Sequence, residues 1–228
     1  MNSSYKNEAP PEITDTPNAK ERLLEAAIDV FGKYGFSGAT TRMIAQRAGV
    51  NISAIPYYFN CKEGLYHAVI EHISKIIQLQ IQGTLESIEE RFKADNVKPK
   101  EARALLEKLL IRMINFILGS TQAPRFMRII LREQLDPSGA YNTIYGRVMA
   151  PVITAIAKMI TVIAHVATTR EAHLRAVMVM GQILAFRMAR ETIVRMLDVK
   201  GYSPEETAEI KKMIIEQTQA TLKGLSQT

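Results

Sequence analysis

The segment 40–65, TTRMIAQRAGVNISAIPYYFNCKEGL, holds two short helical patterns separated by a glycine, and it decides the fold. Thr40 predicts the start of the first helix because its hydroxyl can accept a backbone N–H, and Gly49 predicts the end. Asn51 predicts the start of a second helix over residues 52–58, which Phe59 closes as an apolar plug. Gly49 also permits a sharp turn between them. The segment therefore predicts a helix-turn-helix whose second helix projects outward.

Helices on both sides complete this unit. Apolar residues recur at helical spacing from Asn18 to Phe31, and Gly35 predicts the end of that helix. A long helical pattern follows from Lys62 to about Phe92. We therefore predict a three-helix head over residues 18–66. Residues 1–17 are polar and contain three prolines, which predicts a disordered arm.

The remaining residues, 67–228, repeat amphipathic helical patterns separated by short breaks. Beyond the long helix they predict helices over 99–119, 122–135, 141–166 with a kink at Pro151, 169–197, and from Ser203 onward. The stretch between Ala176 and Phe186 is apolar on several faces, so it needs cover from two sides. A second copy of the chain is the simplest second cover. The sequence thus predicts an all-α protein that forms a homodimer through its two C-terminal helices.

Composition sets the limits of function. The chain has 228 residues, 47% of them hydrophobic, and a single cysteine, Cys61, which excludes an internal disulfide. The apolar stretch 148–166 is interrupted by Pro151, Lys158 and His165, so we interpret it as a buried helix. With no signal-peptide pattern, we expect a cytoplasmic protein without membrane contact. The net charge of +6 is of little use as an indicator of nucleic-acid binding, because residues 1–70 carry equal numbers of basic and acidic side chains.

Several spaced strings resemble one family. The strings Ala39–Arg42, Ile44–Ala45, Ala48–Val50, Tyr58–Phe59 and Lys62–Leu65 are similar to the head of the TetR family of bacterial regulators. Downstream, the strings at 132–135, 181–187, 190–193 and 224–227 resemble the CecR (YbiH) type of that family. The resemblance implies an N-terminal helix-turn-helix DNA-binding domain and a C-terminal domain that binds an effector and dimerises.

The resemblance also implies roles for single residues. Thr41 contacts phosphate and Arg42 a base, while Tyr58 and Lys62 contact phosphates. These roles suit the chemistry, because hydroxyls and ammonium groups bind phosphate oxygens and Arg pairs with guanine. Bases are assigned to the start of the second short helix, and two further residues complete the predicted DNA-binding set. Ile52, Ser53 and Ala54 are the residues expected to contact bases. The two further members of the set are Asn51 and Tyr57, of which Tyr57 is included on its chemistry alone.

Two positions depart from the family pattern. Pro56 stands where the family usually has a tyrosine that contacts phosphate, and it removes one helix donor. Cys61 replaces the usual serine-like cap of the fourth helix. A thiol at a helix N-terminus beside Lys62 gains thiolate character, so an alternative function is a redox-sensing regulator that acts through Cys61. The other interpretation of Cys61 is an inert substitution at the cap.

The body offers candidates for effector binding. The expected set is Met113, Phe116, Met127, Gln182 and Phe186, and the expected ligand is apolar or amphipathic because thioethers adapt to such surfaces. Core packing is the competing interpretation of these residues. The four histidines show no metal-ligand spacing, and no nucleophile elbow or phosphate loop is present. We expect no metal, no cofactor and no catalysis.

These observations favour a sequence-specific DNA-binding regulator. We expect a repressor that a small effector releases from a pseudo-palindromic operator, because two-fold symmetry in the protein requires it in the DNA. The resemblance further implies control of transport or drug-efflux genes. An architectural DNA-binding protein without an effector is the competing hypothesis, and it would select no sequence.

Overall fold

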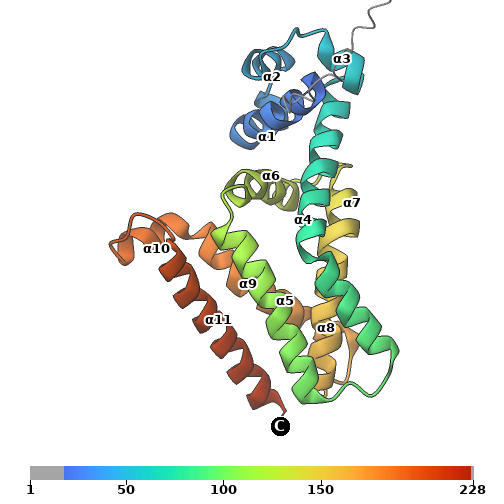
Figure 1. The fold of residues 1–228 in the computed structure, drawn as a ribbon, viewed down its shortest axis with the longest axis vertical. Coiled ribbons are helices and arrows are strands. Elements are labelled where there is room, and N and C mark those ends of the chain that lie inside the picture. Colours follow the sequence, from blue (N-terminus) through green and yellow to red (C-terminus); the bar gives the residue numbers. More distant parts are fainter. Residues whose placement is uncertain (1–17, 227–228) are drawn as a thin grey trace, which may run out of the picture.

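The computed structural model describes residues 18–226, which contain helices and no strand (Figure 1). The elements are α1 (Ala19–Gly38), α2 (Thr41–Ala48), α3 (Ala54–Phe59), α4 (Lys62–Lys93), α5 (Pro99–Gly119), α6 (Ala123–Leu135), α7 (Tyr141–Ile144), the π-helical turn η1 (Tyr145–Met149), α8 (Ala150–Ala164), α9 (Thr169–Met188), α10 (Arg190–Met196) and α11 (Pro204–Leu225). The all-α prediction is confirmed. The arm predicted at residues 1–17 lies outside the described residues.

The head consists of α1, α2, α3 and the first turn of α4. Asn18 and Glu21 form a capping box at the start of α1: the Asn18 Oδ1 accepts the Glu21 N–H at 3.0 Å, and the Glu21 carboxylate accepts the Asn18 N–H at 3.1 Å. Thr40 caps α2 by accepting the Met43 N–H at 3.2 Å. Apolar side chains from all four helices bury the core of the head: Leu23, Ile28, Phe31, Ile44, Ile55, Phe59 and Leu65.

One helix boundary in the head agrees with the prediction and one differs. Gly35 ends the regular part of α1 as predicted, since its backbone is non-helical with a positive φ (φ 73°, ψ 175°), and a further turn continues to Gly38. The third helix begins at Ala54, not at residue 52. The Asn51 Oδ1 accepts hydrogen bonds from the Ser53 N–H (2.9 Å) and the Ser53 hydroxyl (2.8 Å). Asn51 therefore holds a turn ahead of α3, because a side chain bonded two residues on competes with helix formation.

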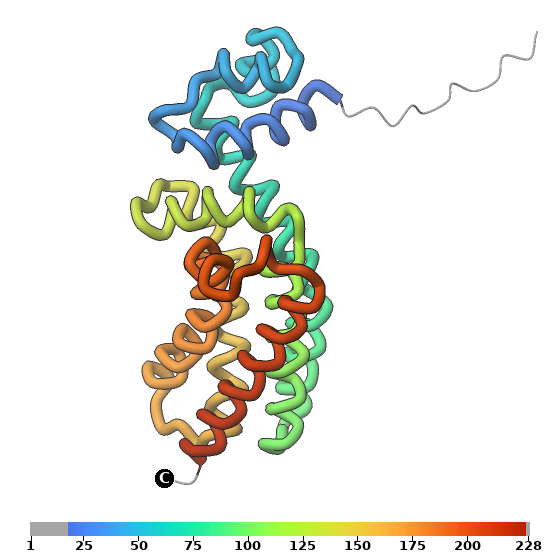
Figure 2. The backbone as a smooth tube through the Cα atoms, turned by 90° about the vertical axis from the view of Figure 1, so that its left-hand side faces the viewer, coloured from blue at the N-terminus to red at the C-terminus, as the bar shows by residue number. Residues whose placement is uncertain are grey.

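The body is a bundle around α8, which packs against α5, α9 and α11. In Figure 2, α11 crosses the front of the bundle, with α9 on its left and α4 and α5 on its right. Buried aliphatic side chains fill the interior, among them Ile88, Leu109, Ile114, Ile156, Ile160 and Ile183. Burial of this apolar surface is the main contribution to the stability of the bundle.

Two predicted helices of the body are interrupted. In place of the kink expected at Pro151, the helix contains a π-helical turn one turn earlier, at Tyr145–Met149. Pro151 has no N–H for the carbonyl of Arg147 and its ring crowds that group, so a wider turn relieves the contact. The helix predicted over 169–197 is broken at Ala189 (φ −89°, ψ 17°). At that end the Tyr202 hydroxyl donates to the Phe186 carbonyl at 2.8 Å and satisfies one freed acceptor.

One helical stretch is long and apolar enough to cross a membrane by composition. It spans Tyr141–Ala164, with a mean hydropathy of 1.7 in its most apolar window, and half of that window is buried inside the protein. Its α8 portion is the central helix of the bundle. Core packing accounts for this hydropathy without a lipid phase.

The head and the body meet along α4 and α6. The 32-residue α4 begins in the head and continues into the body, so the boundary predicted after Tyr66 falls inside a helix. The shorter α6 lies beneath the head and packs against α1 (Figure 1). Here the Tyr66 hydroxyl donates to the buried Glu133 carboxylate at 2.6 Å, and the Ser138 N–H donates to the same group at 3.1 Å.

Candidate nucleic-acid interface

Local sequence signals set the turn between α2 and α3 and leave one side of α3 free, as contact with a DNA groove would require. α2 ends at Gly49, whose left-handed backbone (φ 63°) turns the chain, and α3 is then anchored from below by the buried Ile55 and Phe59. The opposite side of α3 is exposed: Tyr57 is 80% accessible and Tyr58 40%. Their rings meet edge to face, with centroids 4.8 Å apart. The helix therefore presents two aromatic hydroxyls to solvent.

The structure brings part of the predicted set together. An open hollow of about 620 Å³ beside α3 is lined by five predicted residues and by the N-terminal part of α1. The five are Asn51, Ser53, Ala54, Tyr57 and Tyr58. The rest of the set, Thr41, Arg42, Ile52 and Lys62, lies outside this hollow, and of these Arg42 and Ile52 are exposed. These DNA contacts stay predictions, but nearly all have the access that a contact requires.

Arg22 is a candidate that the sequence did not reveal. It lies on α1 and lines the same hollow as Tyr57 and Tyr58. A guanidinium there suits a phosphate of the DNA strand beside α3, the proposed reading helix. Its position in the sequence is that of an ordinary exposed residue of an amphipathic helix, so only the packing of α1 against α3 identifies it.

Two positions near α3 explain how the departures from the family pattern are accommodated. Pro56 is exposed and lies in the first turn of α3, where backbone N–H groups have no partner within the helix, so its missing donor costs little. Cys61 is exposed at the N-cap of α4 and makes no side-chain cap hydrogen bond. The redox alternative based on Cys61 stays a prediction. Lys62 lies over the Phe36 ring at 4.5 Å, so it must swing outward to reach a phosphate.

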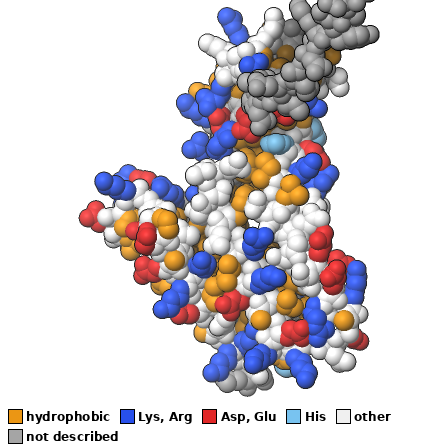
Figure 3. Space-filling model, in the orientation of Figure 1, with side chains coloured by type: hydrophobic (Ala, Val, Ile, Leu, Met, Phe, Trp, Pro, Cys, Tyr) orange, Lys and Arg blue, Asp and Glu red, His pale blue; other side chains and the backbone are white. Residues whose placement is uncertain are grey.

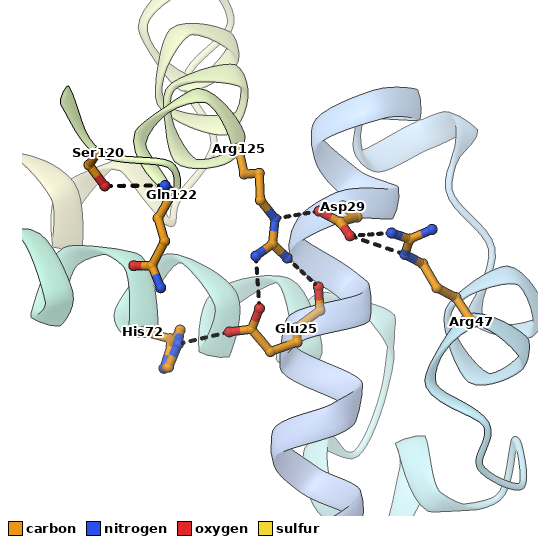
Figure 4. A network of polar contacts seen from close by, with 7 residues as sticks. All are labelled: Glu25, Asp29, Arg47, His72, Ser120, Gln122 and Arg125. Carbon is orange, nitrogen blue, oxygen red and sulfur yellow. Dashed lines mark hydrogen bonds and ion pairs between the residues drawn. The ribbon is translucent and has the colours of Figure 1, made fainter. Parts of the chain in front are cut away.

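Acidic side chains of the head are turned toward the body. The Arg125 guanidinium, on α6, binds the Asp29 carboxylate at 2.5 Å and the Glu25 carboxylate at 2.9 Å, and it also donates to the Glu25 carbonyl at 3.0 Å (Figure 4). Arg47, on α2, binds the other Asp29 oxygen, with its Nε at 3.1 Å. His72 Nε2, on α4, is 3.7 Å from Glu25. One cluster therefore joins α1, α2, α4 and α6.

This pairing changes the charge that DNA meets. Glu25 and Asp29 are neutralised at the junction, and Glu21 is engaged in the cap of α1. On the face drawn in Figure 3 the head accordingly shows more Lys and Arg than Asp and Glu. Residues 18–70 alone carry six Lys or Arg against four Asp or Glu, because three of the acidic residues counted over 1–70 belong to residues 1–17. Positive charge on that surface favours phosphate.

We expect an Asp29→Asn variant to be less stable than the parent at neutral pH, with a smaller difference between the two proteins in acid. Burial opposes ionisation of Asp29, but hydrogen bonds from Arg125 and Arg47 outweigh it and hold the pKa below its usual value. A lowered folded-state pKa stabilises the protein at pH values above the unfolded-state pKa of about 4, and this contribution is lost as pH falls further, through the folded-state pKa. Urea unfolding at pH 7 should show a loss of about 1 kcal/mol in the variant, discounted for solvent exposure, and a smaller loss at pH 2.

The exposed Asp198, on the loop between α10 and α11, supplies the matched control. Asp198→Asn should unfold like the parent at both pH values. A deficit in Asp29→Asn that persists unchanged at pH 2 would show that the ion pairs are not its source.

Comparison with known proteins assigns the family. A family model described as bacterial regulatory proteins of the tetR family matches residues 23–69. A second model, the C-terminal domain of the HTH-type transcriptional dual regulator CecR, matches residues 102–225. The chain belongs to the TetR family. It is 35% identical over 213 residues to the dual regulator CecR of Shigella flexneri, covering 92% of this chain and 93% of that one.

Other TetR-family proteins share the fold at lower identity. Mycobacterium smegmatis AmtR has a TM-score of 0.61 and 17% identity, covering 95% of this chain and 96% of that one. AibR, solved in complex with isovaleryl coenzyme A and operator DNA, has a TM-score of 0.63 and 14% identity, covering 88% and 97%. The chain is therefore a DNA-binding transcriptional regulator and not an enzyme, as the sequence predicted.

In this TetR-family chain the body contains an apolar cavity of about 360 Å³ between α4, α5, α6, α8 and α9. Met113, Phe116 and Met127 line it, and effector binding by them stays a prediction. Gln182 and Phe186 do not. The Gln182 amide instead accepts a hydrogen bond from Thr218 of α11 at 3.3 Å, and Phe186 packs against the core. The lining positions of α9 are Val177, Met180, Gly181 and Leu184, a stripe at helical spacing that leaves residues 182 and 186 on other faces.

Metal binding finds no support in residues 18–226, where no group of three or more His, Cys, Asp or Glu side chains is placed to hold an ion.

Proposed function

We propose that the chain is a homodimeric, cytoplasmic repressor that binds a pseudo-palindromic operator through its two heads and is released by a small molecule in the apolar cavity. The observation that carries this proposal is the geometry of α3, which is anchored by Ile55 and Phe59 and exposes Tyr57 and Tyr58. An exposed short helix held by two others fits the major groove. The relative CecR is named a dual regulator; repression is the direction that we propose for this chain.

The bases and phosphates can be divided among the exposed residues. Arg42 and the start of α3 are proposed to read base edges, since Arg pairs with guanine and small side chains fit against a thymine methyl group. Thr41, Tyr58, Lys62 and Arg22 are proposed to hold phosphates, which fix the register of the head on the duplex.

The proposed dimer face lies on α9 and α11. Leucine, valine and methionine side chains are exposed along one side of α9 at helical spacing, with small residues between them, and α11 adds an exposed methionine. They are Leu174, Val177, Met178, Gly181, Ala185 and Met188, with Met213 of α11. Apolar side chains repeated along an exposed helix favour packing against another helix. A dimer that binds two successive half-sites must hold its two copies of α3 about 34 Å apart.

Release is proposed to pass through α6. Met127 and Ile130 of α6 line the cavity, while Arg125 of the same helix binds Glu25 and Asp29 of α1. A ligand that favours one position of α6 therefore favours one position of the head, and differential affinity of a few kcal/mol is sufficient for release. The genes that we propose to be regulated are transport or drug-efflux genes, an inference from the likeness to the CecR type.

Operator selection followed by substitution tests this function. The purified protein should enrich a palindromic sequence from random duplexes. On that sequence Arg42→Ala should lower affinity about tenfold or more, because a bidentate contact to guanine contributes about 1–3 kcal/mol of discrimination. It should also relax selectivity at one base pair of each half-site.

Lys108→Ala is the matched control, since it removes one positive charge from an exposed position of α5 in the body. Its gel-shift titration should coincide with that of the parent. Equal losses in the two variants would indicate a general charge effect, and an unchanged affinity in Arg42→Ala would remove this residue from the interface.

A further inference from the structure

The cavity of the body has no charged group in its wall. Aliphatic, thioether and aromatic side chains supply most of the lining, and the polar side chains among the lining residues are Gln134, Tyr141 and Tyr145. An ionised ligand that leaves water needs a counter-charge or several hydrogen bonds at its destination. The lining therefore favours uncharged ligands over charged ligands of the same size.

The deep part of the wall is apolar, and the accessible part is mixed. Ile81, Ile117 and Val152 are buried, whereas Gln134 is exposed and Tyr145 and Val177 are 53% and 51% accessible. The Gln134 side-chain oxygen accepts a hydrogen bond from the Tyr141 hydroxyl at 3.3 Å, and its amide nitrogen carries two N–H donors. A bound molecule would thus find apolar contacts inside and hydrogen-bonding groups at the accessible end.

Cations near the cavity are engaged elsewhere. Arg147 lies two residues from Tyr145, but its guanidinium is paired with Glu71 of α4 at 2.5 Å and bonded to Gln78 at 3.3 Å. Arg132 precedes Gln134 by two positions, and it lies against Gly35 of the head, where it donates to the Lys33 carbonyl at 3.4 Å. Neither side chain is part of the lining. A carboxylate or phosphate in the cavity would find no partner of opposite charge in its wall.

We propose that the effector of this chain is an uncharged, largely apolar small molecule with a single hydrogen-bonding group, bound with its apolar part among Ile81, Ile117 and Val152 and its polar group at Gln134 and Tyr141. Alcohols, phenols and neutral amides belong to this class; fatty acids, organic ammonium ions and phosphorylated cofactors do not. The inference rests on the proposed function in that it assigns a ligand class to the same cavity.

Three probes of similar shape test whether the cavity prefers an uncharged ligand to a charged one. 2-Naphthalenemethanol, 2-naphthoate and 2-naphthylmethylammonium share one aromatic body and differ in charge. Each should be titrated into the full-length protein at pH 7.5 against bound N-phenyl-1-naphthylamine, a neutral fluorescent probe. The alcohol should displace it with at least tenfold higher affinity than either ion. Equal or tighter binding of the carboxylate or the ammonium ion would overturn the proposal, as would failure of the alcohol to displace the probe.

Tyr141→Phe tests the orientation of the ligand. The variant should bind 2-naphthalenemethanol several-fold more weakly and 2-methylnaphthalene, which has no polar group, as tightly as the parent. An equal loss for both compounds would mean that Tyr141 only shapes the cavity and would overturn the assigned orientation. Operator binding without ligand is measured in parallel: its absence contradicts the proposed function, whereas operator binding together with a preference for ions contradicts the ligand class alone.

Discussion

A Gly64→Ala variant is expected to lose most of its operator affinity while its body remains folded. A Cβ at Gly64 would lie 2.0 Å from the backbone oxygen and 3.2 Å from the carbonyl carbon of Phe59. Both obstacles are backbone atoms, so no flexible side chain can move away. Phe59 is buried and anchors α3, and the clash must therefore separate α3 from α4 and tilt the reading helix.

Strain of this kind costs about 1–3 kcal/mol, which corresponds to a loss in operator affinity on the order of tenfold to a hundredfold if the head has to recover its geometry on DNA. Gly83→Ala is the matched control on the same helix, because a Cβ there meets no atom within 4 Å. That substitution should leave operator affinity unchanged and stabilise α4 by about 0.5–1 kcal/mol. Gel-shift titration and thermal unfolding measure both effects, and parental affinity in Gly64→Ala would contradict the geometry of the α3–α4 junction.

The second large effect is expected at the buried carboxylate between head and body. Glu133 is 3% accessible and accepts hydrogen bonds from the Tyr66 hydroxyl at 2.6 Å and from the N–H and hydroxyl of Ser138. Burial, followed by the hydrogen bond to Glu133, raises the pKa of Tyr66 above its ordinary value, so the phenol stays protonated and donates. Tyr66→Phe removes this donor and leaves a buried charge with fewer partners.

The free energy of unfolding should fall by about 1.5–3 kcal/mol in Tyr66→Phe, the range for hydrogen bonds to charged groups. Glu133→Leu should also destabilise, because it leaves the Tyr66 hydroxyl and the Ser138 N–H without an acceptor. The double variant should lose less than the sum of the two, since replacing both partners removes the unsatisfied pair. Tyr34→Phe removes the same atom from an exposed ring and should have an effect within about 0.5 kcal/mol. Strict additivity in urea unfolding would argue against the Tyr66–Glu133 bond.

Local signals account for what the sequence could predict. Thr40, Gly49 and Ser203 act within three or four residues of chain, through caps and turns, and the helices they delimit are present. These features depend on helix geometry, which a single sequence expresses directly. Met113, Phe116 and Met127, which were selected for the chemistry of an adaptable apolar pocket, line the cavity, and their role in effector binding stays a prediction.

Contacts between distant segments could not be predicted in the same way. Arg125 meets Glu25 about 100 positions away, and nothing in either neighbourhood distinguishes it from other exposed arginines. The Tyr202 hydroxyl reaches the Phe186 carbonyl near the break at Ala189 only in the folded chain, and Arg22 lies beside α3 only when α1 packs. Gln182 was misplaced because an apolar helix does not reveal which of its faces meets the cavity.

Because α4 is one continuous helix, it connects the cavity in the body rigidly to the head. Ile77 touches the cavity and Lys62 begins the helix inside the head, fifteen residues apart, which at 1.5 Å per residue is roughly 22 Å. Rotation of this rod by about 10° around its cavity end moves the head through roughly 4 Å, close to the 3.4 Å step between base pairs. In the release that we propose, a rotation of this size would leave the packing of the body intact and would move each head by about one base-pair step along the DNA.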